Sequence, residues 1–517
     1  MPGNDLITVD GSSLAIGKVV QVARERTKVT LSKEAAENIR KSRSALERMA
    51  EQGKAIYGVT TGFGALSNTR ITLDQAAELQ TNLLRSHACG VGDNLPTDVV
   101  RAAMLLRLNT LAKGLSAVRL DVARLIESLL NNGIHPTIPS RGSVGASGDL
   151  APLSHMALAL LGEGNVEFHG EIVPASQALA ECHLKPLTPT MKEGLALTNG
   201  TQISTAIAAL VVHDAEALLK VAEIAVGMSL EALRGFVQPF DTRIHDARPI
   251  QGQMDVAHNI RSLVAGSSLV KEKVTGEHES VQDSYSLRCS PQILGAAREA
   301  IAFARRLVEI ELNSATDNPL VFADSDDVLS GGNFHGQPIG LAMDVIAIGL
   351  ATIAGFSERR IFTILDPDLN HGLPAFLAGG KEAGLRSGLM AIQYTAAALA
   401  SENKVLAHPA SVDSIPTCGD LEDYVSMSPT AGHKANAILS NAQRVTAIEL
   451  ICAAQALELR DPGKAGRGTR VAFERIRQKV SMVREDRPLA QDIETVRSMI
   501  VDGSIVQGVE SSIGPLK

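Results

Sequence analysis

Residues 142–155 read Gly142-Ser143-Val144-Gly145-Ala146-Ser147-Gly148-Asp149-Leu150-Ala151-Pro152-Leu153-Ser154-His155, a glycine-rich stretch directly before an apolar run. At its centre, small side chains allow the amide nitrogen of Gly148 to approach the carbonyl carbon of Ala146. Closure of that ring, with loss of two waters that includes the Ser147 hydroxyl, would produce a 4-methylidene-imidazol-5-one (MIO). Such a group is an electrophile that no ordinary side chain offers. The stretch therefore predicts an electrophilic centre in a strained loop.

Three other interpretations of this stretch stay open at this point. A phosphate-binding loop is one, although neither Gly-x-x-x-x-Gly-Lys-Ser/Thr nor Gly-x-Gly-x-x-Gly is present. An acyl-transfer nucleophile at Ser147 is another, although the second glycine of Gly-x-Ser-x-Gly is missing. The third is a purely structural turn with Asp149 or Ser147 as the N-cap of a helix.

Four further motifs accompany the Ala146-Ser147-Gly148 stretch in a fixed order. They are Tyr57-Gly58-Val59-Thr60-Thr61-Gly62-Phe63-Gly64, Asn199-Gly200-Thr201, Gln282-Asp283-Ser284-Tyr285-Ser286-Leu287-Arg288-Cys289 and Gly331-Gly332-Asn333-Phe334-His335. With these motifs the chain resembles the MIO-dependent aromatic amino acid ammonia-lyases over nearly its whole length, and most closely their histidine-specific branch. Any one motif alone would be a weak signal, whereas five in the family's order are specific.

The resemblance implies a role for each matching residue. MIO would form from Ala146, Ser147 and Gly148 and take the substrate's amino group, so that neither pyridoxal phosphate nor a metal is needed. Tyr57 would accept the β-proton, a role that calls for a depressed pKa. Amide and phenol donors would stabilise charge on the MIO oxygen, and a guanidinium would pair with the substrate carboxylate. The residues that match those lining and binding positions are Asn199, Tyr285, Gln282, Phe334, Arg288, His87 and Met390.

Two positions depart from the pattern of histidine lyases. Ser440 stands where a glutamate is usual, and Leu421, within Thr417-Cys418-Gly419-Asp420-Leu421-Glu422-Asp423, stands where glutamine is common. Because a carboxylate is a natural partner for an imidazole, its loss would weaken histidine as the substrate and leave the lyase chemistry intact. Since Ser440 occupies the position of that glutamate, we expect it to line the substrate pocket.

The expected reaction is elimination of ammonia from an aromatic or heteroaromatic L-amino acid, with L-histidine to trans-urocanate as the first choice. Tyrosine or phenylalanine ammonia-lyase, or a related 2,3-aminomutase, is the alternative within the family, since His87 suits a phenol as well as an imidazole. Two alternatives come from other classes: a serine hydrolase using Ser147, and a catalytically silent helical assembly protein.

Composition sets the class of protein. The 517 residues are 45% hydrophobic and 21% charged, which is typical of a globular chain with a large core. Aromatic residues make up only 3%, so the core is built from Ala, Leu, Ile and Val, as in closely packed helices. A net charge of −8 argues against nucleic-acid binding. Five dispersed cysteines without a Cys-x-x-Cys pair, and an N-terminus without signal-peptide features, favour the cytoplasm.

Hydrophobic periodicity predicts a mainly α fold: a large central bundle of long helices and a smaller N-terminal α+β region that carries the Tyr57 loop. The expected domains are 1–115, with the Tyr57 loop and the His87 segment, and 116–517, a helical bundle with the MIO loop.

Residues 194–213 lack charged side chains except His213 but are too polar for a membrane span. Predicted helices cover 32–53, 73–87, 98–112, 292–312, 338–356, 388–404 and 432–459, with a linker at 461–468. Helices apolar nearly all round need other helices around them, and the resemblance implies a homotetramer with shared active sites, a small-molecule amino acid substrate and no membrane partner.

Overall fold

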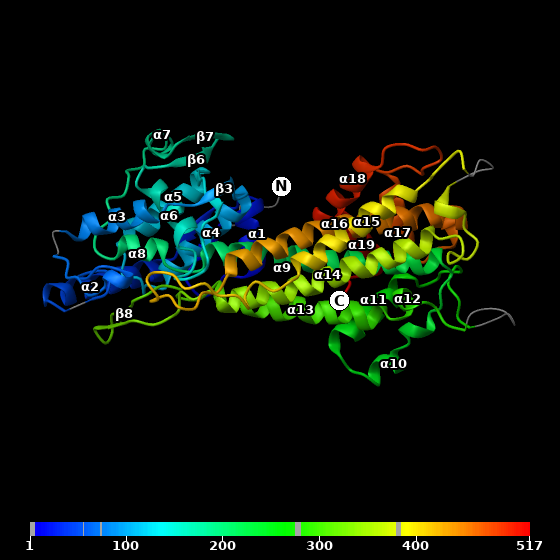
Figure 1. Ribbon diagram of the computed structural model, residues 1–517, viewed down its shortest axis with the longest axis horizontal. Coiled ribbons are helices and arrows are strands. Elements are labelled where there is room, and N and C mark those ends of the chain that lie inside the picture. The colour runs from blue at the N-terminus through cyan, green and yellow to red at the C-terminus, as the bar shows by residue number, and fades with distance from the viewer. Residues whose placement is uncertain (1–5, 55, 73–74, 274–280, 379–383) are drawn as a thin grey trace. The chain divides into compact units, whose positions relative to one another are not determined.

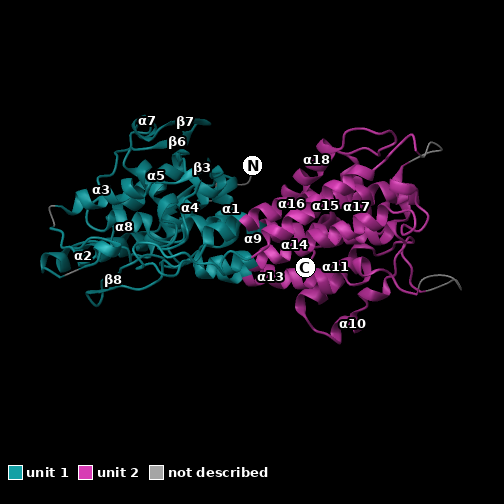
Figure 2. Cartoon of the chain, viewed as in Figure 1, with its two compact units in different colours: residues 1–213, 304–344, 409–433 teal, residues 214–303, 345–408, 434–517 magenta. Residues whose placement is uncertain are grey.

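The computed structural model describes residues 6–54, 56–72, 75–273, 281–378 and 384–517 (Figure 1). The described residues form nineteen α-helices and nine short strands, so the predicted mainly α fold is confirmed. The chain folds into two compact units (Figure 2): unit 1 comprises residues 1–213, 304–344 and 409–433, and unit 2 comprises 214–303, 345–408 and 434–517. The boundary predicted at residue 115 lies inside unit 1 and stays a prediction.

Unit 1 combines short helices with small sheets. Strands β1 (Ile7–Val9) and β2 (Val29–Leu31) pair in parallel, and the other pairs are antiparallel. These strands are β3 (Val91–Asn94) with β5 (Pro139–Arg141); β6 (Asn165–Phe168) with both β4 (His135–Pro136) and β7 (Glu171–Pro174); and β8 (Leu320–Phe322) with β9 (Asp327–Leu329). The helices are α1 (Ile16–Arg24), α2 (Lys33–Glu51), α3 (Ala76–His87), α4 (Thr97–Ala112), α5 (Leu120–Asn132), α6 (Leu150–Leu160), α7 (Ala175–Glu181) and α8 (Glu193–Thr198).

Four long helices have residues in both units: α9 (Gln202–Ala232), α13 (Ser290–Glu311), α14 (Gln337–Leu365) and α16 (Ser428–Arg460). Unit 2 adds α10 (Thr242–Asp246), α11 (Gln251–Leu263), α12 (Tyr285–Arg288), α15 (Met390–Leu406), α17 (Arg467–Arg477), α18 (Ala490–Val501) and α19 (Ser504–Ile513). The predicted long helices are confirmed, and their ends differ from the predicted ends by up to nine residues, the largest difference being at the C-terminus of α14, Leu365 instead of residue 356.

Local signals explain where several elements begin and end. Ser32 caps α2, because its Oγ accepts a hydrogen bond from the Ala35 amide at 3.0 Å. α5 ends at Gly133, which has a left-handed φ of 71°. The predicted loop at 57–66 contains a 3-10 turn, Gly64–Leu66, and the predicted linker at 461–468 contains another, Pro462–Lys464. Residues 1–5, 73 and 74, to which the signal-peptide and helix predictions refer, lie outside the described residues.

Helix α14 is long and apolar enough to span a membrane by length and composition alone. Its apolar window is 67% buried inside the protein, which is the pattern of a core helix. The helices of unit 2 also bury a charged cluster. Glu449 of α16 accepts hydrogen bonds from Arg360 of α14 at 2.5 and 2.7 Å and from Ser229 of α9 at 2.7 Å, and the Arg360 and Glu449 side chains are both 0% exposed. A buried ion pair is stable only when its carboxylate oxygens accept further hydrogen bonds, as those of Glu449 do.

Candidate active site

The glycine-rich loop lies against the start of α9. Gly148 has a left-handed φ of 77°, and a β-carbon there would collide with the carbonyl oxygen of Gly200. Gly200 donates its amide to the Ser147 carbonyl oxygen at 3.3 Å, and its own carbonyl oxygen accepts from the Asp149 amide at 2.7 Å. Glycine is therefore needed at 148, because the backbone of Gly200 fills the space that a side chain would occupy.

A second segment holds the loop from its other side. The amide of Met427 donates to the Val144 carbonyl oxygen at 2.9 Å, and Ser426 Oγ donates to the Gly145 carbonyl oxygen at 3.0 Å. Ala146 packs in a small apolar cluster with Val425 and Met427. The tripeptide Ala146-Ser147-Gly148 is thus fixed between residues 425–427 and Gly200, as a strained loop needs to be.

A carboxylate contacts the central serine of the tripeptide. Ser147 Oγ donates to Oε1 of Glu422 at 2.9 Å, and Oε2 of the same carboxylate accepts from Thr417 Oγ1 at 2.7 Å. The sequence singles out this stretch for Leu421 and misses its neighbour Glu422. One signal in the sequence could have identified Glu422: it is an acidic residue directly after Leu421, a position that the sequence already singles out.

Ser440, by contrast, is bound by arginines of unit 2. Its Oγ accepts from Arg444 Nη1 at 2.6 Å and from Arg497 Nη2 at 3.4 Å. The place of Ser440 in the substrate pocket stays a prediction, while Glu422 provides a carboxylate beside Ser147.

Tyr57 lies half-buried before the 3-10 turn at Gly64–Leu66. Its Oη accepts a hydrogen bond from the Gly64 amide at 2.9 Å, and its ring packs edge-on against Phe63. Burial raises the pKa of Tyr57, and the charges of Cys418 and Glu422 raise it further, while the hydrogen bond from Gly64 lowers it. Desolvation and neighbouring negative charge both disfavour the phenolate in this chain, and the role of Tyr57 as a base stays a prediction.

Asn199 and Asp149 complete the described surroundings of the loop. Nδ2 of Asn199 donates to Asp317 Oδ1 and to the Asn318 carbonyl oxygen, both at 3.2 Å. Asp149 precedes α6, but its carboxylate makes no capping bond; it accepts from the amide of Ser204 at 2.8 Å and from its Oγ at 2.6 Å. Complete burial raises the pKa of Asp149 to about 6, against the lowering effect of these bonds.

His87 and Phe334 also belong to unit 1. His87 ends α3, and its Nδ1 lies 3.0 Å from Ser86 Oγ; Phe334 is half-buried. Within the described part of the chain, neither residue has a hydrogen bond to the loop at 142–149. The structure links the tripeptide to Tyr57 through Glu422 and to Asn199 through Gly200, and it places His87 and Phe334 in the same unit.

The other predicted site residues lie in unit 2. Gln282 precedes α12, Tyr285 begins that helix and is 67% exposed, and Met390 begins α15. The guanidinium of Arg288 lies 4.6 Å from the centre of the Tyr285 ring. Nε of Arg288 is buried, and among the described residues it has no hydrogen-bond partner. This N–H is available to an anionic group such as a carboxylate. As for metals, the described residues contain no group of three or more His, Cys, Asp and Glu side chains that could hold an ion.

Comparisons with known proteins show which family the chain resembles. A family model described as "Aromatic amino acid lyase" matches residues 14–478. The chain is 48% identical to a histidine ammonia-lyase of Alkaliphilus oremlandii over 98% of this chain and 99% of that protein. It is 49% identical to a histidine ammonia-lyase of Gloeobacter violaceus, with 99% of each chain covered.

A solved structure gives the same result for the fold. A tyrosine aminomutase from Streptomyces globisporus superposes with a TM-score of 0.95, at 40% identity, over 99% of this chain and 100% of that one. The family match and the full-length relatives confirm the prediction that this chain is a lyase. The chain belongs to the aromatic amino acid lyase family.

Proposed function

We propose that this protein eliminates ammonia from L-histidine to give trans-urocanate, using an MIO group made from Ala146, Ser147 and Gly148. The observation that carries the proposal is the hydrogen bond between Ser147 and the Glu422 carboxylate, in a loop that Gly200 holds tightly folded. The full-length similarity to proteins named histidine ammonia-lyase supports the choice of substrate.

The residues present fit the formation of the group. Gly148 has a left-handed φ of 77°, which suits a tight loop. Loss of the Ser147 hydroxyl as water needs a proton delivered to Oγ while the Cα proton of Ser147 is removed, and the Glu422 carboxyl, which contacts Oγ at 2.9 Å, would be the group that delivers that proton. Once formed, MIO supplies an electrophile that takes the substrate's amino group and makes it a better leaving group. Because it derives from the chain itself, the proposal needs neither pyridoxal phosphate nor a metal.

Among the described residues, the Tyr57 phenol and the Glu422 carboxylate, which contacts Ser147 and raises the pKa of Tyr57, are candidates to accept the β-proton. Tyr57 is the proposed base, and the raised pKa of its phenol means that its phenolate must be stabilised when substrate binds. Glu422 has a second role in the proposal: its carboxylate is the partner for the imidazole ring that Ser440 does not provide. A cationic or hydrogen-bonding imidazole gains more from this carboxylate than a phenyl ring does.

The proposed substrate-binding residues are those that match the family's binding positions. Arg288 would bind the substrate carboxylate through its unpaired Nε, with Tyr285 beside it. The remaining proposed pocket residues are His87, Asn199, Gln282, Phe334 and Met390. We propose a cytoplasmic homotetramer in which sites are shared between subunits, because exposed Tyr285 needs a partner surface to become part of an enclosed site.

The test is ultraviolet absorbance of the purified protein mixed separately with L-histidine, L-tyrosine and L-phenylalanine. A rise for histidine alone supports the proposal. A rise for tyrosine or phenylalanine alone would show that histidine is the wrong substrate, while the proposed elimination of ammonia would stand. The tyrosine aminomutase superposition makes a β-amino acid product the second candidate, which chiral chromatography of the tyrosine reaction detects. A peptide containing Ala146, Ser147 and Gly148 with unreduced mass would refute the MIO group.

A further inference from the structure

An unusual ion pair lies behind Asn199. Lys192 Nζ contacts Asp317 Oδ2 at 2.6 Å, and both side chains are 0% exposed. Lys192 also has a left-handed backbone, with φ 69° and ψ −17°, which is unfavourable for a residue with a β-carbon. Burying two charges and straining a backbone each reduce the free energy of unfolding. Because this ion pair does both, we expect it to have a role in the neighbouring site.

The pair determines which end of the Asn199 amide is available. Both hydrogens of Nδ2 are directed to acceptors, Asp317 Oδ1 and the Asn318 carbonyl oxygen, each at 3.2 Å. Asp317 Oδ1 is in turn held by the Asn318 amide at 2.7 Å. Because both partners accept, the amide orientation is fixed by chemistry, and Oδ1 is the side-chain atom of Asn199 that is left to meet a ligand.

The main chain of Asn199 is fixed as well. Arg107, fully buried, donates from Nη1 to the Asn199 carbonyl oxygen at 2.9 Å and to that of Ala196 at 2.8 Å. The next residue, Gly200, forms the backbone contact with Gly148. A displacement of Asn199 would therefore be felt at the tripeptide.

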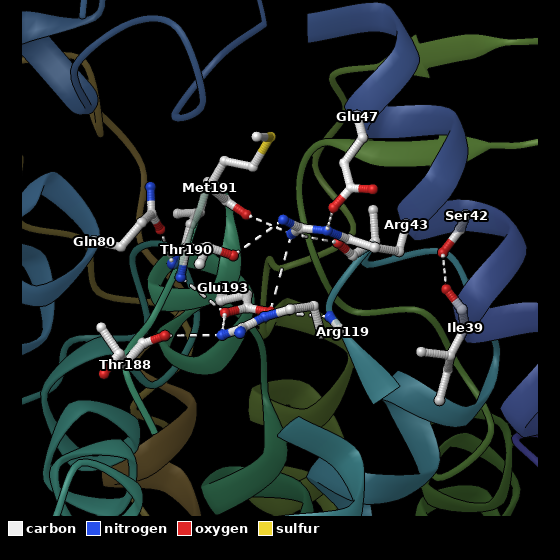
Figure 3. A network of polar contacts seen from close by, with 12 residues as sticks. Ile39, Ser42, Arg43, Glu47, Gln80, Arg119, Thr188, Thr190, Met191 and Glu193 are labelled. Carbon is white, nitrogen blue, oxygen red and sulfur yellow. Dashed lines mark hydrogen bonds and ion pairs between the residues drawn. The ribbon is translucent and has the colours of Figure 1, made fainter. Parts of the chain in front are cut away.

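A separate network fixes the turn that carries Lys192 (Figure 3). Glu193 is 0% exposed and accepts from Arg119 Nε and Nη2 at 2.8 and 2.7 Å. On the same turn, Arg43 donates to the Met191 carbonyl oxygen and to Thr190 Oγ1, both at 3.0 Å. With residues 190, 191 and 193 bound in this way, the residue between them is held in its left-handed conformation.

We propose that Asp317, held by Lys192, is a positioning residue that makes Asn199 a hydrogen-bond acceptor toward the substrate's amino group. The inference rests on the proposed function, which places Asn199 in the pocket. It also replaces the expectation that Asn199 donates to the MIO oxygen, because both of its N–H bonds are already used. An amide oxygen facing an ammonium group stabilises the amine as it binds and as ammonia leaves.

Two matched double variants test this role. Lys192→Met/Asp317→Asn removes both charges and keeps an oxygen acceptor for Asn199 and for the Asn318 amide. Lys192→Met/Asp317→Leu removes both charges and the acceptor. Both variants remove the same two charges, and both leave the buried Arg107 with Asp149 as the remaining compensating carboxylate, so the two differ chiefly in whether Asn199 is held. If the leucine variant is not recovered folded, Lys192→Met/Asp317→Ala takes its place with the same expected results.

We expect the asparagine variant to retain kcat within about tenfold and the leucine variant to lose about 100-fold, the scale of a misplaced catalytic contact. Addition of Asn199→Ala should then cost activity in the asparagine background and nothing further in the leucine background. If the ion pair served stability alone, the variants would differ in thermal midpoint, and Asn199→Ala would cost the same activity in both backgrounds. Equal kcat in the two folded double variants, or equal losses on adding Asn199→Ala, would overturn the inference.

The same samples separate this inference from the proposed function. Mass spectrometry of the peptide containing residues 146–148 shows in each variant whether two waters have been lost. A wild-type protein with an unmodified peptide or without ammonia release refutes the proposed function. A cyclised, active wild type with uncoupled variants refutes only the role of Asp317.

Discussion

Replacing Gly148 by alanine tests whether the backbone contact with Gly200 is as close as the structure shows. Alanine at a φ of 77° costs about 1–2 kcal/mol for the left-handed conformation alone. Its β-carbon would also lie 2.5 Å from the Gly200 carbonyl carbon and 3.0 Å from its α-carbon, which are backbone atoms that cannot rotate away. Overpacking of this kind adds about 1–3 kcal/mol, giving roughly 2–5 kcal/mol in total.

Gly133 provides a matched control. It has a φ of 71°, and a β-carbon there would meet no atom within 4 Å, so Gly133→Ala should cost only the conformational part, about 1–2 kcal/mol. Thermal unfolding followed by circular dichroism should rank the midpoints as wild type, then Gly133→Ala, then Gly148→Ala. Peptide mass should show loss of two waters in the control and greatly reduced loss in Gly148→Ala. Equal midpoints for the two variants, together with full cyclisation of Gly148→Ala, would refute the close contact.

Three further predictions concern charge and proton transfer. Tyr57→Phe should lower kcat far more than it raises KM, because a proton acceptor is lost and most binding contacts remain; steady-state kinetics showing unchanged kcat would remove Tyr57 from that role. The pKa of Asp149 is raised from 3.8 to about 6, so its contribution to stability is present below pH 3.8 and is lost as the pH rises through 6. Asp149→Asn should therefore gain about 2 kcal/mol relative to wild type between pH 4 and pH 7, measured by denaturant unfolding at each pH, and a difference that does not change with pH would contradict the shift. Glu449→Gln breaks a buried ion pair and should destabilise by about 3–5 kcal/mol, whereas Glu309→Gln, in a partly exposed pair, should cost less than about 1 kcal/mol; similar thermal midpoints for these two variants would be the contrary result.

The helices and the tripeptide could be predicted because their signals are local. Ser32 before a charged amphipathic run marks the start of α2, and the apolar run after residue 337 marks α14. Glu422 could not be assigned in this way, because its contact with Ser147 joins residues 275 positions apart. The pKa of Tyr57 is raised chiefly by burial, and the same distant carboxylate raises it further. Only the folded chain shows which neighbours surround a titratable group.

The orientation of Asn199 was unpredictable for a related reason. An asparagine in a motif can donate or accept, and its choice depends on what lies behind it. Here Asp317 and Asn318 are both acceptors contributed by a segment 118 and 119 residues away. The same sequence of five motifs thus identifies the family, while the partners of each side chain come from packing.

The long sequence separation between Ser147 and Glu422 has a consequence for biosynthesis. At about 5–20 residues per second, a ribosome adds Glu422 roughly 15–55 s after Ser147. Under the proposed chemistry, the carboxylate that contacts the serine hydroxyl, and residues 425–427 that hold the loop, are absent throughout that interval. If the proposal holds, the nascent chain carries an ordinary tripeptide, and the reactive group forms only after the last segment of unit 1 has left the ribosome and docked. Maturation thereby reports completed folding, and a truncated chain ending before residue 422 would be released without the electrophile.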